Sequence, residues 1–209
     1  MNYQDCKKER SELATFMCRL YRQKLTTCSG GNLSMRLDEQ HIIITPSSLD
    51  KGVIEAGEIG LMTIDGENLT PHLKPSIETD MHLEIYRHRQ DISAIVHAHP
   101  VMASSFSAMG PQINTRLTAE AYLVIGKVNF APYALMGSAA LSKIVAEKVK
   151  DANVVIMENH GVTTLGKSLL AAYDRMEVLE AAAQMTINTA IMQSARELNA
   201  ERIAELDRW

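Results

Sequence analysis

One apolar segment, residues 92–99, constrains this chain more than any other because it ends in two histidines. It reads Ile-Ser-Ala-Ile-Val-His-Ala-His and is followed by Pro100, which predicts a buried β-strand that stops near His99. Side chains two positions apart on a strand point to the same face, so His97 and His99 project together. A third imidazole, His160, follows another short apolar run at residues 154–157 and could join them.

Three imidazoles with an open fourth position are typical of a catalytic zinc site, whereas structural zinc sites are closed by four protein ligands. An isolated histidine beside a strand is more often a hydrogen-bonded core residue. The pairing of His97 with His99, and a third histidine in a similar place, favours a metal site over that interpretation. We expect one Zn²⁺ per subunit, although imidazole sites also accept cobalt, manganese or nickel.

Composition limits the classes of partner that this chain can have. The 209 residues are 46% hydrophobic, enough for a sizeable core, and the net charge is −4 without a basic stripe. Binding to nucleic acid or to a membrane surface is therefore not expected. Three cysteines without a C-x-x-C spacing indicate a reducing compartment. With no signal peptide and no apolar run of membrane-spanning length, we expect a cytoplasmic protein.

Strands and helices joined by short loops predict one α/β domain over residues 1–209. We expect helices over residues 9–24, from an N-cap at Ser76 to residue 87, and over 101–109, 138–150 and 169–199. We expect strands over residues 41–45, 58–64, 92–99 and 154–157, and one or two within 122–132. Residues 26–34 are expected to form a loop. A stripe of Met and Ala along the last helix is expected to be core or subunit interface.

Several polar residues are weaker candidates for a site. Glu78 lies at a predicted helix start, where a carboxylate often serves only the helix dipole, and His82, four residues on, fits a core imidazole. Gly30-Gly31-Asn32 could present backbone N–H groups to an anion. Hydroxyls at three serines could add to that, although turns and caps explain them equally well: Ser47, Ser48 and Ser76. No motif supports a P-loop, a dinucleotide fold, a metalloprotease or a serine hydrolase.

Six short motifs, taken in order, are far more specific than any of these residues alone. They are Gly30-Gly31-Asn32-Leu33-Ser34, Ile44-Thr45-Pro46-Ser47, Lys74-Pro75-Ser76-x-Glu78, His97-Ala98-His99, Ala131-Pro132-Tyr133 and Glu158-Asn159-His160-Gly161. This series resembles the class II aldolase/adducin superfamily, and within it the branch that cleaves ketose 1-phosphates of the L-fuculose 1-phosphate type. The resemblance spans residues from about 10 to 190.

The resemblance implies a three-layer α/β/α fold around a mostly antiparallel sheet, and a homotetramer with active sites between subunits. It implies zinc ligation by His97, His99 and His160, with Glu78 as the catalytic acid/base. Substrate phosphate would be held by residues that match the family's phosphate segments: Gly31, Asn32, Ser47, Ser48 and Ser76. The implied reaction is reversible retro-aldol cleavage of a sugar phosphate to dihydroxyacetone phosphate and a small aldehyde.

Departures from the pattern leave other reactions open. Ile77 stands where a second phosphate-binding serine is usual, and residues 115–122 show no clear match for the family's proton-donor tyrosine. The sequence up to Trp209 also shows no clear counterpart of the family's mobile C-terminal tyrosine. Glu120 could supply a second carboxylate near the metal, or it could be a surface or interface charge. The alternatives are epimerisation, dehydration or decarboxylation on the same metal platform, and an adducin-like scaffold without catalysis. A Schiff base on Lys74 is a further, more distant alternative.

Overall fold

The computed structural model describes residues 3–110 and 112–208. In these residues seven strands form one sheet in the order β3-β2-β1-β4-β7-β6-β5. The strands are β1 (Asn32–Arg36), β2 (His41–Ile44), β3 (Gly60–Thr63), β4 (Ala94–Ala98), β5 (Val128–Ala131), β6 (Val154–Met157) and β7 (Gly161–Gly166). Neighbouring strands run antiparallel, except that β5 and β6 are parallel. The expected mostly antiparallel sheet is confirmed.

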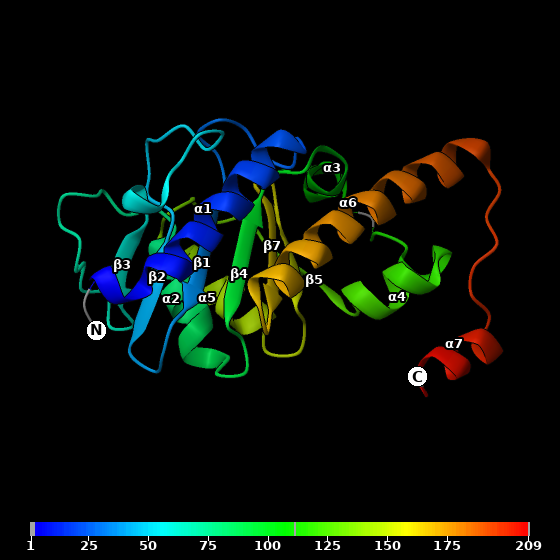
Figure 1. Ribbon diagram of the computed structural model, residues 1–209. Helices are drawn as coiled ribbons and strands as arrows, with labels where there is room; N and C mark the ends of the chain where they lie inside the picture. The colour runs from blue at the N-terminus through cyan, green and yellow to red at the C-terminus, as the bar shows by residue number, and fades with distance from the viewer. Residues whose placement is uncertain (1–2, 111, 209) are drawn as a thin grey trace.

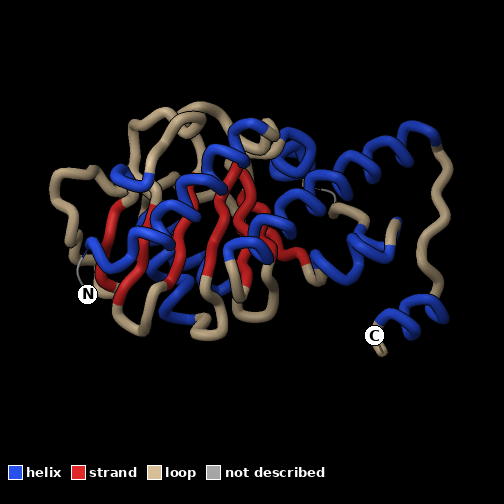
Figure 2. The backbone as a smooth tube through the Cα atoms, in the orientation of Figure 1, coloured by secondary structure: helices blue, strands red, loops and turns tan. Residues whose placement is uncertain are grey.

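Helices cover both faces of the sheet (Figure 1). They are α1 (Lys7–Arg22), α2 (Thr79–His88), α3 (Val101–Met109), α4 (Ala119–Ile125), α5 (Ala139–Lys148), α6 (Leu169–Met192) and α7 (Ala200–Leu206). Short 3-10 turns occupy Tyr3–Cys6, Ala56–Glu58 and Thr115–Leu117. Helices α1, α3 and α6 pack on one face and α2 and α5 on the other, which gives the expected three layers (Figure 2). No helix in the described part of the chain is long and apolar enough to cross a bilayer.

Alternation along the central strand β4 decides which layer each side chain enters. Val96 and Ala98 belong to the core beneath α1, α3 and α6, whereas Ile95 belongs to the core beneath α2 and α5. His97 shares the side of Ile95 because residues two apart face the same way. The strand therefore delivers this imidazole, fully buried, to the layer that holds α2.

Two predictions near the strands are wrong. The expected loop over residues 26–34 ends early, because β1 begins at Asn32 and pairs with both β2 and β4. Its polar residues resemble a loop in isolation, but Asn32 and Ser34 are buried and hydrogen-bonded. Strand β7 was not predicted, since its Gly and Thr residues carry a weak local signal and its pairing with β4 is long-range.

One strand, β5, lies within residues 122–132 as predicted. The first part of that range belongs to α4, which was not predicted and which the Thr118 side chain caps by accepting from the Ala121 N–H. Two predictions about helix bounds are corrected. The helix expected to be capped by Ser76 begins at Thr79. The last helix ends at Met192, where Gln193 takes a left-handed conformation, and a separate α7 follows. By contrast, the bounds predicted for residues 101–109 and 154–157 are confirmed.

Candidate active site

Three imidazoles converge at one end of the central strands. His97 lies in β4, His99 follows the end of that strand, and His160 lies in the tight turn between β6 and β7. That turn closes with Met157 paired to Gly161 and with Asn159 at a φ of 52°. One possible ligand atom from each imidazole lies within 4.8 Å of the other two. The spacing along the sequence predicts that His97 and His99 lie together, and the β6–β7 hairpin brings His160 to them.

His97 is oriented as a metal ligand would be. Its Nδ1–H donates to the carbonyl oxygen of Val162 at 3.0 Å, which leaves Nε2 as the nitrogen that faces the site. Nε2 is buried, and the carboxylate of Glu78 lies 3.1 Å from it. Metal-bound histidines commonly donate their second ring N–H to a carbonyl in this way, because the bond fixes the tautomer and the ring orientation. These donor atoms therefore fit a divalent cation.

The carboxylate of Glu78 lies between two of these imidazoles. Its Oε2 is 3.1 Å from His97 Nε2 and its Oε1 is 3.0 Å from His160 Nε2, although Glu78 is only 5% exposed. Burial by itself would raise the pKa of Glu78, but the attraction of His97 and His160 holds that pKa well below its usual range. Glu78 is therefore a buried, ionised carboxylate beside a cluster of imidazole nitrogens that could hold a metal ion.

Burial and the neighbouring charges also shift the pKa values of His97 and His99. The pKa of His97 is raised because its ion pair with Glu78 outweighs the opposing effect of burial. The pKa of His99 falls to about 3, mainly through burial and then through repulsion by His97 and His160. Neutral imidazole is the form that binds metal, so His99 needs no deprotonation, while the raised pKa of His97 shows that the site attracts positive charge.

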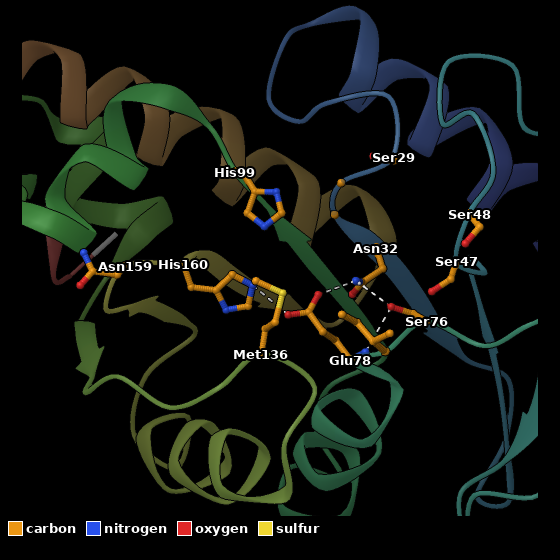
Figure 3. Close-up of a pocket in the computed structure, with 13 residues that line it drawn as sticks. Ser29, Asn32, Ser47, Ser48, Ser76, Glu78, His99, Met136, Asn159 and His160 are labelled. Atoms are coloured by element: carbon orange, nitrogen blue, oxygen red, sulfur yellow. Dashed lines mark hydrogen bonds and ion pairs between the residues drawn. The ribbon is translucent and has the colours of Figure 1, made fainter.

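A pocket of about 560 Å³ opens beside this cluster (Figure 3). Its lining includes most of the predicted site residues: Gly31, Asn32, Ser47, Ser48, Ser76, Glu78, His99 and His160. Gly31 has a φ of 67°, and a Cβ there would lie 2.8 Å from the carbonyl oxygen of His97. Only glycine allows the loop before β1 to pass so close to β4.

Asn32 joins the pocket to the buried carboxylate. Its Nδ2 donates to Ser76 Oγ at 3.0 Å and to Glu78 Oε2 at 2.8 Å, as the dashed lines in Figure 3 show. Both amide hydrogens are thus used inside the site. A direct contact between Asn32 and substrate phosphate stays a prediction, and it would require one of these bonds to be exchanged.

Comparison with known proteins agrees with this geometry. Residues 11–187 match the Class II Aldolase and Adducin N-terminal domain. The chain belongs to this family. An L-fuculose phosphate aldolase of Methanococcus maripaludis is 38% identical over 170 residues, which cover 81% of this chain and 91% of that protein. A 3-oxo-tetronate 4-phosphate decarboxylase of Pectobacterium atrosepticum is 31% identical over 204 residues, 95% of this chain and 92% of that one.

The fold of the family is also shared. A solved L-fuculose 1-phosphate aldolase superposes with a TM-score of 0.86 at 30% identity, over 94% of this chain and 93% of that one. Proteins named for two different reactions, aldol cleavage and decarboxylation, therefore match 81% and 95% of this chain, so membership of the family does not fix the reaction.

The pocket differs from the predicted site at several residues. Glu120, predicted as a possible second carboxylate, lies exposed on α4 and is not among the described residues that line the pocket of its own chain. Met136 and Asn159 line the pocket but were not predicted. Asn159 lies within the Glu158-to-Gly161 motif, which could have indicated it. Met136 follows the Ala131-to-Tyr133 motif, but no sequence signal marks it.

Proposed function

We propose that this protein is a zinc-dependent aldolase that reversibly cleaves a ketose 1-phosphate of the L-fuculose 1-phosphate type. The products would be dihydroxyacetone phosphate and a small aldehyde. The observation that carries the proposal is the contact of Glu78 with His97 and His160 at the floor of a hydroxyl-lined pocket. An ionised carboxylate beside three imidazoles supplies both a proton-transfer group and a place for a cation.

His97, His99 and His160 would hold the metal, which when bound would act as a Lewis acid on the substrate carbonyl. Cleavage moves one proton in net from the C4 hydroxyl to C3: a base would take the hydroxyl proton as the C3–C4 bond breaks, and Glu78 would deliver a proton to C3. In the synthetic direction the ionised Glu78 carboxylate would remove the C3 proton. Asn32 keeps the Oε2 atom of Glu78 occupied by an N–H, which leaves Oε1 on the side of His160.

Hydroxyls and backbone dipoles would bind the phosphate. Ser47, Ser48 and Ser76 line one side of the pocket, and α2 begins three residues after Ser76, so the positive end of its dipole lies near that side. Among the described lining residues there is no lysine or arginine. Phosphate held this way would fix the carbon chain relative to Glu78, which is the positional part of catalysis.

Decarboxylation or another reaction through the same carbanion is the second candidate. It is favoured by the match over 95% of the chain to a 3-oxo-tetronate 4-phosphate decarboxylase. Ile77, 55% exposed at the pocket, stands where a second phosphate-binding serine is usual in fuculose-phosphate aldolases, which weakens the aldolase assignment in particular. A non-catalytic scaffold would not require the buried contact between Glu78 and two histidines.

A substrate panel with and without chelator tests the proposal. L-Fuculose 1-phosphate, other ketose 1-phosphates and 3-oxo-tetronate 4-phosphate are incubated with the protein, and dihydroxyacetone phosphate and CO₂ are measured separately. Release of dihydroxyacetone phosphate from a ketose 1-phosphate, without CO₂, that chelator abolishes and Zn²⁺ restores supports the aldolase. Turnover of 3-oxo-tetronate 4-phosphate alone, with CO₂ and dihydroxyacetone phosphate released together, would replace it with the decarboxylase, because loss of CO₂ from that four-carbon acid leaves dihydroxyacetone phosphate. Turnover that chelator leaves unchanged would refute metal dependence.

The proposal includes a single domain that assembles as a homotetramer in the cytoplasm. Assembly bears on Glu120, because α4 of a neighbouring subunit could bring this carboxylate to a pocket that its own chain does not reach. Sedimentation velocity would give the oligomeric state. Equal kcat values for Glu120→Gln and the unaltered protein would remove Glu120 from the site.

A further inference from the structure

A chain of buried side chains leads away from Glu78 beneath the pocket. His82 Nε2 lies 2.6 Å from Asn32 Oδ1, and His82 Nδ1 lies 2.6 Å from Ser34 Oγ. Ser34 Oγ lies 2.9 Å from the hydroxyl of Tyr86. His82, Ser34 and Tyr86 are all fully buried, and none of them lines the pocket. Their hydrogen bonds therefore serve the protein interior and not a ligand directly.

The carboxylate fixes the direction of the first two bonds in this chain. Ionised Glu78 can only accept, so the nitrogen of the Asn32 amide must face it and the amide oxygen must face His82. His82 must then carry a proton on Nε2 and donate it to that oxygen. Burial lowers the pKa of His82 to about 3 and so favours a neutral ring, whose Nδ1 accepts from the Ser34 hydroxyl. Ser34 in turn accepts from the Tyr86 hydroxyl.

We propose that His82 is a positioning residue that holds the Asn32 amide, and through it the carboxylate of Glu78, in one orientation. This inference rests on the proposed function of Glu78. Asn32 has two stable amide rotamers related by a flip, and only one of them presents N–H groups to both Ser76 and Glu78. The Nε2–H of His82 excludes the other rotamer, because flipping would oppose two N–H donors.

The location of His82 makes this role specific to the site. It lies one helical turn after Glu78, and that spacing brings it beneath β1 at Asn32 and Ser34. Glu78 itself precedes the first helical residue of α2 and has no side-chain capping bond in that helix. The Asn32 amide is therefore the neutral donor that orients the carboxylate of Glu78, whose other side-chain contacts are to the imidazoles of His97 and His160.

Substitution of His82 tests the proposal through turnover. His82→Leu removes the donor and should lower kcat about 100-fold, because small misplacement of a reacting group costs about that much. The KM for the sugar phosphate and the bound zinc should stay near their original values. His82→Gln keeps an N–H donor near Nε2 and should recover most of the loss. Leu83→Ala, a buried change on the same helix, controls for lost stability.

Nitrogen-15 NMR of the substrate-free protein tests the same proposal without any reaction. The resonances of His82, assigned by their loss in His82→Gln, should show a neutral ring protonated on Nε2 across pH 6 to 8. A ring protonated on Nδ1, or an imidazolium, would overturn the proposal. So would a kcat for His82→Leu no lower than that of Leu83→Ala. A protein that turns over no substrate but shows the Nε2–H ring would refute the proposed function and leave the orientation of Asn32 standing.

Discussion

Gly161 offers a sharp test of the histidine cluster, because a single methyl group there would collide with a proposed ligand. A Cβ built on Gly161 would lie 2.5 Å from His99 Cδ2 and 2.7 Å from the carbonyl oxygen of Ala98. Ordinary contact begins near 3.4 Å, so the Cβ sits about 0.9 Å too close to the ring. The carbonyl belongs to the strand β4 end and yields little, so we expect the imidazole of His99 to move by on the order of 1 Å.

That displacement should weaken zinc binding and should also lower the stability of the fold. Misplacing a ligand or its supporting group typically costs 10–100-fold in metal affinity, or about 1.4–2.7 kcal/mol, while overpacking costs about 1–3 kcal/mol of stability. Gly161→Ala would therefore show a raised zinc Kd by competition with a chromogenic chelator. Its Tm without metal would fall by several degrees.

Gly57→Ala is the matched control, since a Cβ at Gly57 meets nothing within 4 Å. Neither glycine has a φ in the left-handed region, so backbone strain does not distinguish the two variants. Gly57→Ala should bind zinc as the unaltered protein does. An equal zinc Kd for Gly161→Ala and Gly57→Ala would refute the assignment of His99 as a ligand held against β7.

Three other changes have defined outcomes. Glu78→Gln should lower kcat by about 10²–10⁴-fold while zinc stays bound, as measured by turnover and metal analysis of the same sample. Removing metal with chelator should lower the Tm, and zinc at about 100 times its Kd should restore about 2.7 kcal/mol of stability in thermal or urea unfolding. Burial and the nearby His97 lower the pKa of His82 to about 3 in the folded protein, below an unfolded value near 6.5. The stability that comes from keeping His82 neutral is therefore complete above pH 6.5 and is lost as the pH falls. Between pH 7 and pH 5, urea unfolding of the unaltered protein should therefore show about 2 kcal/mol more loss than that of His82→Gln, and parallel pH profiles would contradict this.

The sequence predicts the local part of this site and not the long-range part. Two-residue alternation is a property of a single strand, so it correctly indicates that His97 and His99 lie together. The short apolar run before His160 likewise predicts a strand with the bounds that the structure shows. These signals need no knowledge of which strands pair.

Strand pairing is what local patterns could not supply. Asn32 is in a strand because β1 lies between β2 and β4, and its polar side chain is buried because His82, fifty residues away, satisfies it. A Gly-Gly-Asn segment read alone favours a loop. Likewise, the contact between Glu78 and His160 joins a helix start to a hairpin turn, and no spacing along the chain indicates it.

The placement of β4 in the middle of the sheet has a consequence for how the site behaves without metal. Three strands lie on each side of it, and its backbone is bonded to β1 and to β7. Amides in such a strand exchange with deuterated solvent only through the rarest openings of a protein. The backbone that carries His97 is thus as rigid in the apo protein as any part of the molecule. Metal binding would therefore cost little entropy at His97, because the backbone that carries this ligand is already ordered. The amide of His97 should be among the last to take up deuterium, whether or not zinc is present.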